Sequence, residues 1–344
     1  MGEDHTLEEI IAGQIAREGP MPFVRFMELA LYHPEYGYYA RAGGQIGRRG
    51  DFYTNVSVSS LFGQLIGQQL AEMWRAMGAP ASFVVAEQGA HTGQFCADVF
   101  FWMSQFDKDL YNAVTYWFIE PRENYRQVQR QTLQGTGVPL SKVFWTDSWA
   151  GLKEDAMEGL VFSNELLDSM PVHRVQFLDS NWHEQYVVRD RGKFVFKLGE
   201  FSTPDLADAI RQIPPNHIQR YSTEINLNAQ RWMREVARVL RRGFVFTIDY
   251  GFPAEVYYCR TRVEGTLVCY YKHQRRYFPL DLVGHQDITS HVDFTALERV
   301  GREAGLETTG FVDQQRFMVG IAHDDLEGFE AHTAEALGMS EEQR

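Results

Sequence analysis

The chain lacks several features that would define its class at once. Its 344 residues include only three cysteines, Cys96, Cys259 and Cys269, without CxxC spacing, so neither a disulfide framework nor a structural zinc site is expected. There is no HExxH motif for a metalloprotease and no GxSxG motif for a serine hydrolase. No apolar run approaches the length of a membrane-spanning helix, so no membrane span is expected.

Positive charge is also scarce. Lys and Arg number 33 against 46 Asp and Glu, which gives a formal net charge of −13. A general nucleic-acid binder needs a basic face, so this class is disfavoured. Residues 1–19 are acidic and amphipathic and resemble neither a secretion signal nor a mitochondrial presequence. We therefore expect a protein of the cytoplasm or an equivalent reducing compartment.

From residue 81 onward, apolar strands alternate with amphipathic helices. Five short runs carry the strand pattern: SFVVAEQG, AVTYWFIEP, KVFWTD, GLVFSNELLD and GFVFTIDYG. This alternation is typical of a doubly wound parallel sheet. After a final helix capped by Asp293, two strands with a short connection are expected, and short connections force antiparallel pairing. The predicted fold is a Rossmann-like α/β sheet of the class I methyltransferase type, parallel with a terminal antiparallel hairpin.

The remaining segments indicate accessory parts. We expect a helical N-terminal cap over residues 1–80, a core over 81–322 and a tail over 323–344. Insertions interrupt the core at about 173–227, read as antiparallel strands, and at about 252–290, read as aromatic, basic and loop-like. The helix before the fifth strand is expected to be capped by Asn228 and to stop at Gly243.

Every predicted parallel strand ends in a carboxylate or amide side chain. Ligands of open α/β sheets bind outside the carboxyl ends of the strands, at the point where the strand order reverses. Any one acidic residue there could simply cap the next helix, but five in succession favour a ligand-lined crevice. These residues are Glu87, Glu120, Asp147, Asn164 with Glu165, and Asp249.

The loop after the first strand, EQGAHTG, suggests which ligand binds. Gly89 and Gly93 let the backbone approach a ligand closely. Glu120 stands where nucleoside-binding folds place a carboxylate for the ribose hydroxyls, and Asp147 followed by Ser148 could receive an adenine amino group. No basic residue is expected near the loop, which disfavours a phosphate-bearing ligand. S-adenosylmethionine has ribose and adenine, no phosphate and a positive sulfonium, so it fits this pattern.

Taken together, these blocks resemble the MidA-type S-adenosylmethionine-dependent methyltransferases, which include the mitochondrial protein-arginine methyltransferase involved in complex I assembly. The resemblance covers about residues 20–320. It is carried by FMELALYHPEYGYY, GDFYTNVSVSSLFG, EQGAHTG, FIEP, FSNELLDSMPVHR, IDYG, GTLVCYY and GHQDITSHVDFT. It implies S-adenosylmethionine as cofactor and an arginine on a partner protein as acceptor, with a respiratory complex I-type subunit as one candidate.

The resemblance also implies roles for individual residues. Glu87, Gly89 and Gly93 would flank the methionine part of the cofactor, Glu120 would bind the ribose and Asp147 the adenine. The GDFYT segment, with Asp51 and Thr54, and the NELLD block would close over the transferable methyl group.

Arginine methylation needs carboxylates that grip the planar guanidinium and orient one nitrogen toward the methyl group. The alternative role for acidic residues here is in the first turn of a helix. The catalytic candidates are Asn164, Glu165, Asp168 and Asp249, the last as part of an acceptor channel. A His/Asp base among His285, Asp287, His291 and Asp293 is not expected, because Asp293 is explained as a helix cap.

One position departs from the family pattern, which has a carboxylate followed by three alternating glycines. Here His91 occupies the central position. In one interpretation, the His91 side chain packs outward or bonds the carboxylate of the cofactor, and the protein is active. In the other, cofactor binding is weakened and the protein is a catalytically weak or inactive assembly factor. A nicotinamide-dependent oxidoreductase is a further alternative, although the third glycine of GxGxxG is missing.

Overall fold

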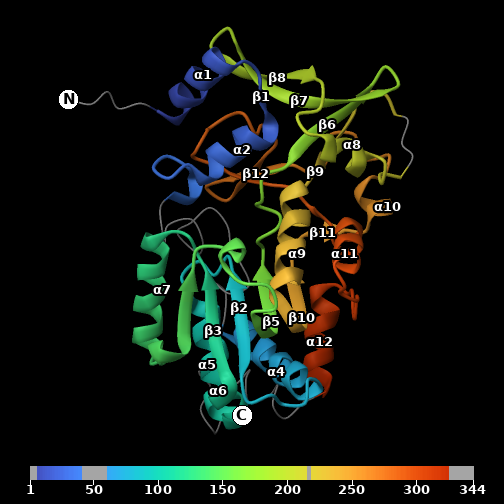
Figure 1. The fold of residues 1–344 in the computed structure, drawn as a ribbon. Helices are drawn as coiled ribbons and strands as arrows, with labels where there is room; N and C mark the ends of the chain where they lie inside the picture. Colours follow the sequence, from blue (N-terminus) through green and yellow to red (C-terminus); the bar gives the residue numbers. More distant parts are fainter. Residues whose placement is uncertain (1–5, 41–59, 215–217, 325–344) are drawn as a thin grey trace, which may run out of the picture.

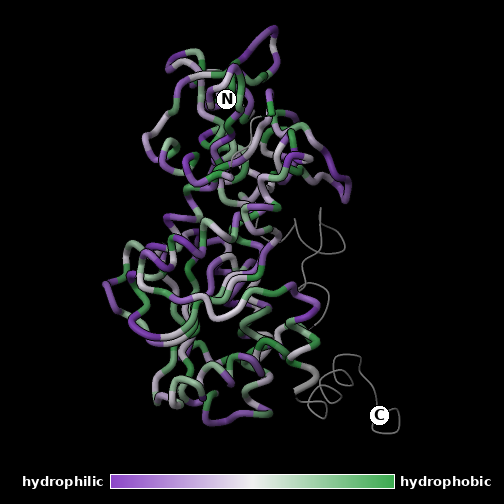
Figure 2. Tube along the Cα trace, turned by 90° about the vertical axis from the view of Figure 1, so that its right-hand side faces the viewer, coloured by the Kyte–Doolittle hydropathy of each residue, from purple (hydrophilic) through white to green (hydrophobic). Residues whose placement is uncertain are grey.

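The chain folds into two halves stacked along the long axis of the molecule (Figure 1). The computed structural model describes residues 6–40, 60–214 and 218–324, with side chains to residue 321. The lower half surrounds a parallel sheet, and the upper, accessory half surrounds an antiparallel sheet. A view turned by 90° shows the same two halves, with hydrophilic stretches prominent at the outer turns (Figure 2). Asp51 and Thr54 lie outside the described residues.

The lower sheet contains all five predicted strands, and every neighbouring pair is parallel. Its order is β10-β5-β2-β3-β4, so the strand order reverses between β2 and β5. The predicted Rossmann-like α/β class is confirmed. The strands are β2 (Phe83–Gln88), β3 (Val114–Ile119), β4 (Val143–Thr146), β5 (Met157–Asn164) and β10 (Leu240–Ile248).

Alternating side chains of these strands supply two separate hydrophobic clusters, as the two-residue period of a strand requires. Phe83 and Val85 pack with helices on one face, whereas Val84 and Ala86 pack on the other. The first face is covered by α4 (Leu61–Ala76), α5 (Gln94–Phe106), α7 (Glu123–Thr136) and α12 (Gln314–Asp324), with α6 (Lys108–Ala113) after α5; the second by α9 (Leu227–Val239) and α11 (Phe294–Glu303).

The expected terminal hairpin is wrong. No strand follows α11 in the described residues, and the last apolar segment forms α12 instead. Asp313 accepts a hydrogen bond from the amide of Arg316 at 2.9 Å and so begins the helix. Phe317 then packs on Phe246 of β10, with ring centroids 5.0 Å apart. A short apolar run fits a strand or a buried helix equally well, and packing against the sheet decides between them here.

The helix before β10 also differs from its prediction. Its cap is Asn226, whose side chain accepts from the amide of Ala229 at 2.8 Å, and not Asn228. Asn228 instead donates to the carbonyl oxygen of Pro171. The helix ends at Val239, and Gly243 lies inside β10.

The accessory half contains the predicted antiparallel strands. β6 (His173–Leu178), β7 (Asn181–Asp190) and β8 (Lys193–Gly199) pair antiparallel, joined by β1 (Met21–Pro22) and β9 (Tyr221–Ile225). α1 (Leu7–Glu18) and α2 (Phe23–Tyr32) pack in the cluster of this half, with Val187 of β7. α8 (Pro204–Ile210) lies beside the same sheet, packed on Val175 of β6. α4, by contrast, packs with the parallel sheet.

The second insertion, expected to be loop-like, contains regular structure. β12 (Val268–Tyr271), β13 (Gln274–Arg276) and β14 (Asp287–Thr289) form a small antiparallel sheet in the order β13-β12-β14. It is anchored by Glu224, whose carboxylate accepts from the amide and hydroxyl of Thr266 at 2.7 and 2.9 Å. Short β11 (Gly251–Phe252), β15 (Val292–Asp293) and α10 (Ala254–Tyr257) flank it. None of the helices in the described parts of the chain has the length and apolarity needed to cross a membrane.

Two glycines allow close packing among β10, β5 and β2 of the parallel sheet. A Cβ on Gly159 of β5 would lie 1.9 Å from the carbonyl oxygen of Val84, and a Cβ on Gly243 of β10 would lie 1.8 Å from that of Gly159. The two glycines are paired in register. Adjacent strands would have to shift to accept a side chain at either position.

We expect Gly159→Ala to lower the free energy of unfolding by about 3 kcal/mol or more, because the clash is with backbone atoms. Urea unfolding followed by circular dichroism measures this. Gly135→Ala is the matched control, since a Cβ there meets nothing within 4 Å. Gly135 lies in the last turn of α7, so this substitution should be neutral or should stabilise by less than about 1 kcal/mol. Equal unfolding midpoints for wild type and Gly159→Ala would contradict the described strand packing.

Candidate functional site

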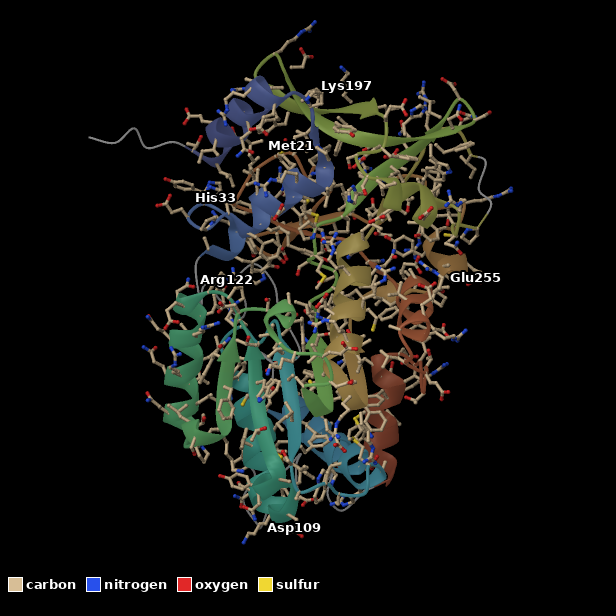
Figure 3. All side chains as sticks on the ribbon, viewed as in Figure 1. Met21, His33, Asp109, Arg122, Lys197 and Glu255 are labelled. Carbon is tan, nitrogen blue, oxygen red and sulfur yellow. The ribbon has the colours of Figure 1, made fainter. Side chains whose placement is uncertain are left out.

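The carboxyl ends of the parallel strands face the accessory half. Figure 3 shows Arg122, just after β3, at the junction of the halves, whereas Asp109, before β3, lies at the far end of the lower half. The polar strand ends predicted from the sequence therefore share this junction.

The loop between β2 and α5 is a tight turn with left-handed backbone at three positions. Gly89, His91 and Gly93 have φ of 83°, 46° and 80°. A Cβ on Gly89 would lie 3.2 Å from Leu166, which follows β5, and one on Gly93 would lie 3.3 Å from Gln129 of α7. Glycine is therefore needed at both ends of the turn, where it packs between β5 and α7.

His91 turns its side chain toward α7. Its ring meets the ring of Tyr125 edge-on with centroids 5.6 Å apart, and its carbonyl oxygen accepts from Gln129. Burial, together with the nearby charge of Arg122, lowers the pKa of His91 to about 4, so the imidazole is neutral at pH 7. Its Nε2 atom is buried without a protein partner in the described residues.

Arg122 corrects the expectation that no basic group lies near the loop. Its backbone amide donates to Glu120 at 3.0 Å, and its guanidinium lies over the ring of Tyr125 at 4.3 Å. The same guanidinium donates to the carbonyl oxygen of Tyr39 in the accessory half. A phosphate-bearing ligand is therefore not excluded by the charge of this loop.

Glu120 and Asp147 lie near one another at this edge of the sheet. Arg126 connects them, because it donates to the carbonyl oxygen of Glu120 at 2.6 Å and pairs with the carboxylate of Asp147. The Glu120 carboxylate is buried, whereas the side chain of Asp147 is 79% exposed and Ser148 is exposed as well. Glu120 thus presents one fixed carboxylate at the end of β3.

Glu87 points into the core instead of toward the junction. Its carboxyl accepts from the hydroxyl of Tyr116 at 2.6 Å, and burial raises its pKa to about 8. The next residue, Gln88, was not predicted from the sequence. Its side-chain oxygen accepts hydrogen bonds from Trp149 at 2.6 Å and from Trp232 at 2.9 Å. Gln88 therefore ties the end of β2 to the helical face opposite Glu87.

A second group of polar residues lies where β5 and β10 end. Asp249 accepts from the backbone amides of Leu167 at 2.8 Å and Asp168 at 3.4 Å, which joins the two strand ends. Glu165 takes a left-handed backbone with φ of 48°, held by a bond from its amide to Ile248. Asn164 has its Oδ1 atom buried without a partner in the described residues.

Asp287 also belongs to this group, although the sequence analysis considered it only for a His/Asp base and set it aside. It is 2% exposed at the start of β14 and accepts from the hydroxyl of Tyr39 at 2.9 Å. The Tyr39 ring stacks on Tyr32, whose hydroxyl donates to the carbonyl oxygen of Ser169. The only sequence signal was its place in the GHQDITSHVDFT block, which indicates no partner.

We call Glu165, Asp168, Asp249 and Asp287 the acidic cluster. The pKa of Asp168 is raised well above its ordinary value, mainly by burial and then by the negative charges of the other three carboxylates in the cluster. Burial raises the pKa of Asp249 to about 7. Like charges this close favour protonated carboxyls until a cation arrives. The structure thus brings together all four catalytic candidates, adds Asp287, and sets His91 and Glu120 apart on the β3 side.

Comparisons with known proteins identify the family of this chain. A model of the S-adenosyl-L-methionine-dependent methyltransferase family matches residues 65–312. A Burkholderia thailandensis protein whose crystal structure is bound to S-adenosyl-homocysteine is 32% identical, with a TM-score of 0.82 over 98% of this chain and 88% of that one. A protein arginine methyltransferase NDUFAF7 homolog, mitochondrial, from Drosophila melanogaster is 27% identical over 91% of this chain and 74% of its own length. The Mus musculus NDUFAF7 is 27% identical over 90% and 73%.

Glu87→Gln should change how stability depends on pH. The folded protein keeps the Glu87 proton up to about pH 8, whereas the unfolded chain loses it near pH 4.5, so the free energy of unfolding falls as pH rises between these values. Because the variant lacks this ionisable group, its free energy of unfolding should fall by roughly 3 kcal/mol less than that of wild type between pH 5 and pH 8. Urea unfolding across this range measures the difference from wild type.

Other carboxyls contribute equally to both proteins, so the comparison isolates Glu87. Glu123→Gln, which removes a carboxyl that is 60% exposed, is the matched control and should follow wild type. Parallel pH profiles for wild type and Glu87→Gln would show that the buried proton is not held.

Proposed function

Because the chain belongs to the family of S-adenosyl-L-methionine-dependent methyltransferases, we propose that it methylates an arginine side chain on a partner protein. The chain is a methyltransferase that uses this cofactor. The family assignment replaces the nicotinamide-dependent interpretation. The observation that carries the arginine proposal is the acidic cluster, which combines four carboxyls at one place beside the predicted methyl position.

The residues on the β3 side fit the cofactor. Bound S-adenosylmethionine supplies a methyl group activated by a positive sulfonium. Glu120 would accept hydrogen bonds from the ribose hydroxyls, since its carboxylate is held in place by the amide of Arg122. The buried Nε2 of His91 has no partner in the described residues and would meet the polar end of the methionine part. Asp147 and Ser148 are exposed next to Glu120, where an adenine would lie.

The acidic cluster fits a cationic acceptor. A guanidinium is always charged and presents a planar fork of donors, so it can bind two carboxylates at once. Its charge would lower the pKa values of Asp168 and Asp249 and leave both ionised. The cofactor would supply its methyl group to the nitrogen that these carboxylates orient, with S-adenosylhomocysteine as the leaving group. The nitrogen then loses one proton, which Glu165 or Asp168 would accept. Orientation by these carboxylates would supply most of the rate enhancement.

The named relatives support a protein acceptor. The insect and mammalian relatives bear the name protein arginine methyltransferase. By the same resemblance, a respiratory complex I-type subunit is the acceptor we propose to test first.

A catalytically weak assembly factor is the alternative raised by His91. Its positive φ keeps the loop in a conformation that glycine would adopt, and its ring packs on Tyr125. This geometry favours the active interpretation, because the loop path is preserved despite the side chain.

Calorimetry with S-adenosylhomocysteine tests the cofactor side. We expect micromolar-range binding by the wild type and a loss of about 100-fold or more for Glu120→Ala, because charged hydrogen bonds to the ribose disappear. Glu123→Ala, on the exposed side of the same helix start, should bind as the wild type does. His91→Gly should weaken binding about three- to tenfold, because the hydrogen bond between Nε2 and the cofactor is lost. No heat with wild type, and a gain with His91→Gly, would instead support the assembly factor.

Transfer of a labelled methyl group to arginine-containing peptides tests the acceptor side. Asp168→Asn should lower kcat/KM about 10- to 100-fold, because a charged hydrogen bond to the guanidinium is lost. Its affinity for S-adenosylhomocysteine should stay that of wild type. Asp109→Asn, which removes an exposed carboxyl at the far end of the lower half, is the matched control. Label found in lysine and not in methylarginine after acid hydrolysis would refute the arginine assignment.

A further inference from the structure

We propose that the hairpin formed by β12 and β13 binds an acidic side chain of the acceptor protein, about three residues from the target arginine. The inference rests on the proposed arginine acceptor and adds a sequence preference to it. We call residues 270–278 the basic hairpin.

The basic hairpin differs in charge from the rest of the chain. Its sequence, YYKHQRRYF, has three cationic residues and no acidic one, in a protein with a formal net charge of −13. Its aromatic residues Tyr277 and Phe278 are 63% and 66% exposed. Exposed aromatic and arginine side chains together are typical of protein-binding surfaces. A partner segment of negative charge would complement it.

The register of the small sheet connects the basic hairpin to the acidic cluster. Tyr270 of β12 stands directly opposite Asp287 on one side and Arg275 on the other. Residues directly opposite in antiparallel strands point to the same face. Asp287, Tyr270 and Arg275 therefore form one row across the sheet, which runs from the buried acidic cluster to the exposed edge.

The electrostatic neighbours of Tyr270 agree with this row. After burial, which raises the pKa of Tyr270, the charges that act on its hydroxyl are Arg275, which lowers the pKa, and Asp168 and Asp287, which raise it. The partly exposed Tyr250 is influenced by Glu165, Asp168 and Tyr270 and lies at the same rim. The row thus begins at Asp287 in the acidic cluster, passes Tyr270 and ends at the cation of Arg275.

Arg275 is the cation of this row that can receive a carboxylate. Its guanidinium lies 5.8 Å from the centre of the Tyr277 ring, and it forms no ion pair within the described residues. The adjacent Arg276, in contrast, pairs with Asp281 at 3.8 Å. An acceptor carboxylate at Arg275 would thus find a charge that is not already neutralised.

The spacing sets the sequence preference. Asp287 and Arg275 are two strand spacings apart, or about 10 Å. A peptide in the polyproline II conformation advances about 3.1 Å per residue and returns to the same face at every third residue. A peptide whose arginine reaches the acidic cluster would therefore place its third neighbour near Arg275. We expect this neighbour to be Asp or Glu.

The experiment compares two arginine peptides that differ at the third position on either side, one with Glu and one with Lys. Binding is measured by fluorescence anisotropy with S-adenosylhomocysteine present, and methyl transfer by label incorporation. Wild type should prefer the Glu peptide about three- to fivefold in both measurements, as one surface charge pair allows. Arg275→Glu should reverse the preference, and Arg275→Ala should abolish it.

Lys197→Glu is the matched control, because it makes the same charge change at an exposed position on β8, at the far end of the accessory half (Figure 3). It should leave the preference unchanged. Equal binding and methylation of both peptides by wild type would overturn the inference and leave the arginine proposal standing. If the Glu peptide binds selectively through Arg275 but no methylarginine forms, the role of the basic hairpin in binding acidic residues would be supported and the arginine proposal overturned.

Discussion

The parallel pairing of β2 with β5 determines where both parts of the site form. From β2 the chain continues to α5 and β3, whereas from β5 it turns the other way into the accessory half, so the two loops separate at one point of the sheet edge. A Cβ on Gly89 in one loop would lie 3.2 Å from the side chain of Leu166 in the other, so the two loops pack closely against each other. The predicted cofactor residues and the acidic cluster therefore lie on either side of one close contact.

Tyr39 connects these two sides from the accessory half. Its carbonyl oxygen accepts from Arg122, beside Glu120 and His91, and its hydroxyl donates to Asp287 in the acidic cluster. One residue of the accessory half thus bonds to both parts of the site. The N-terminal helices and the small sheet are consequently part of how the site is built, and the parallel sheet alone would lack Asp287.

The sequence predicted the parts of the site that lie on regular strands, because buried parallel strands produce continuous apolar runs with polar ends. It did not predict α12, since a short apolar run suits a strand or a buried helix and only contact with Phe246 selects the helix. It also did not place Asp287 in the acidic cluster. The strand that carries Asp287, β14, has only three residues, which are too few to show a period. The residues that interact with Asp287, Tyr39 and Asp168, are more than a hundred residues away in sequence. Contacts of that kind leave no local pattern.

The acidic cluster has a consequence for the energetics of the resting enzyme. Carboxyls that are buried together, with raised pKa values at Asp168 and Asp249, hold protons as long as no cation is present. If the acceptor is an arginine, as proposed, its guanidinium must displace those protons into solvent, so binding of this acceptor and proton release would be thermodynamically linked. The apparent affinity for the acceptor then increases with pH until the cluster is already ionised. In this way, the carboxyls proposed to recognise the substrate would also make the enzyme responsive to the acidity of its surroundings.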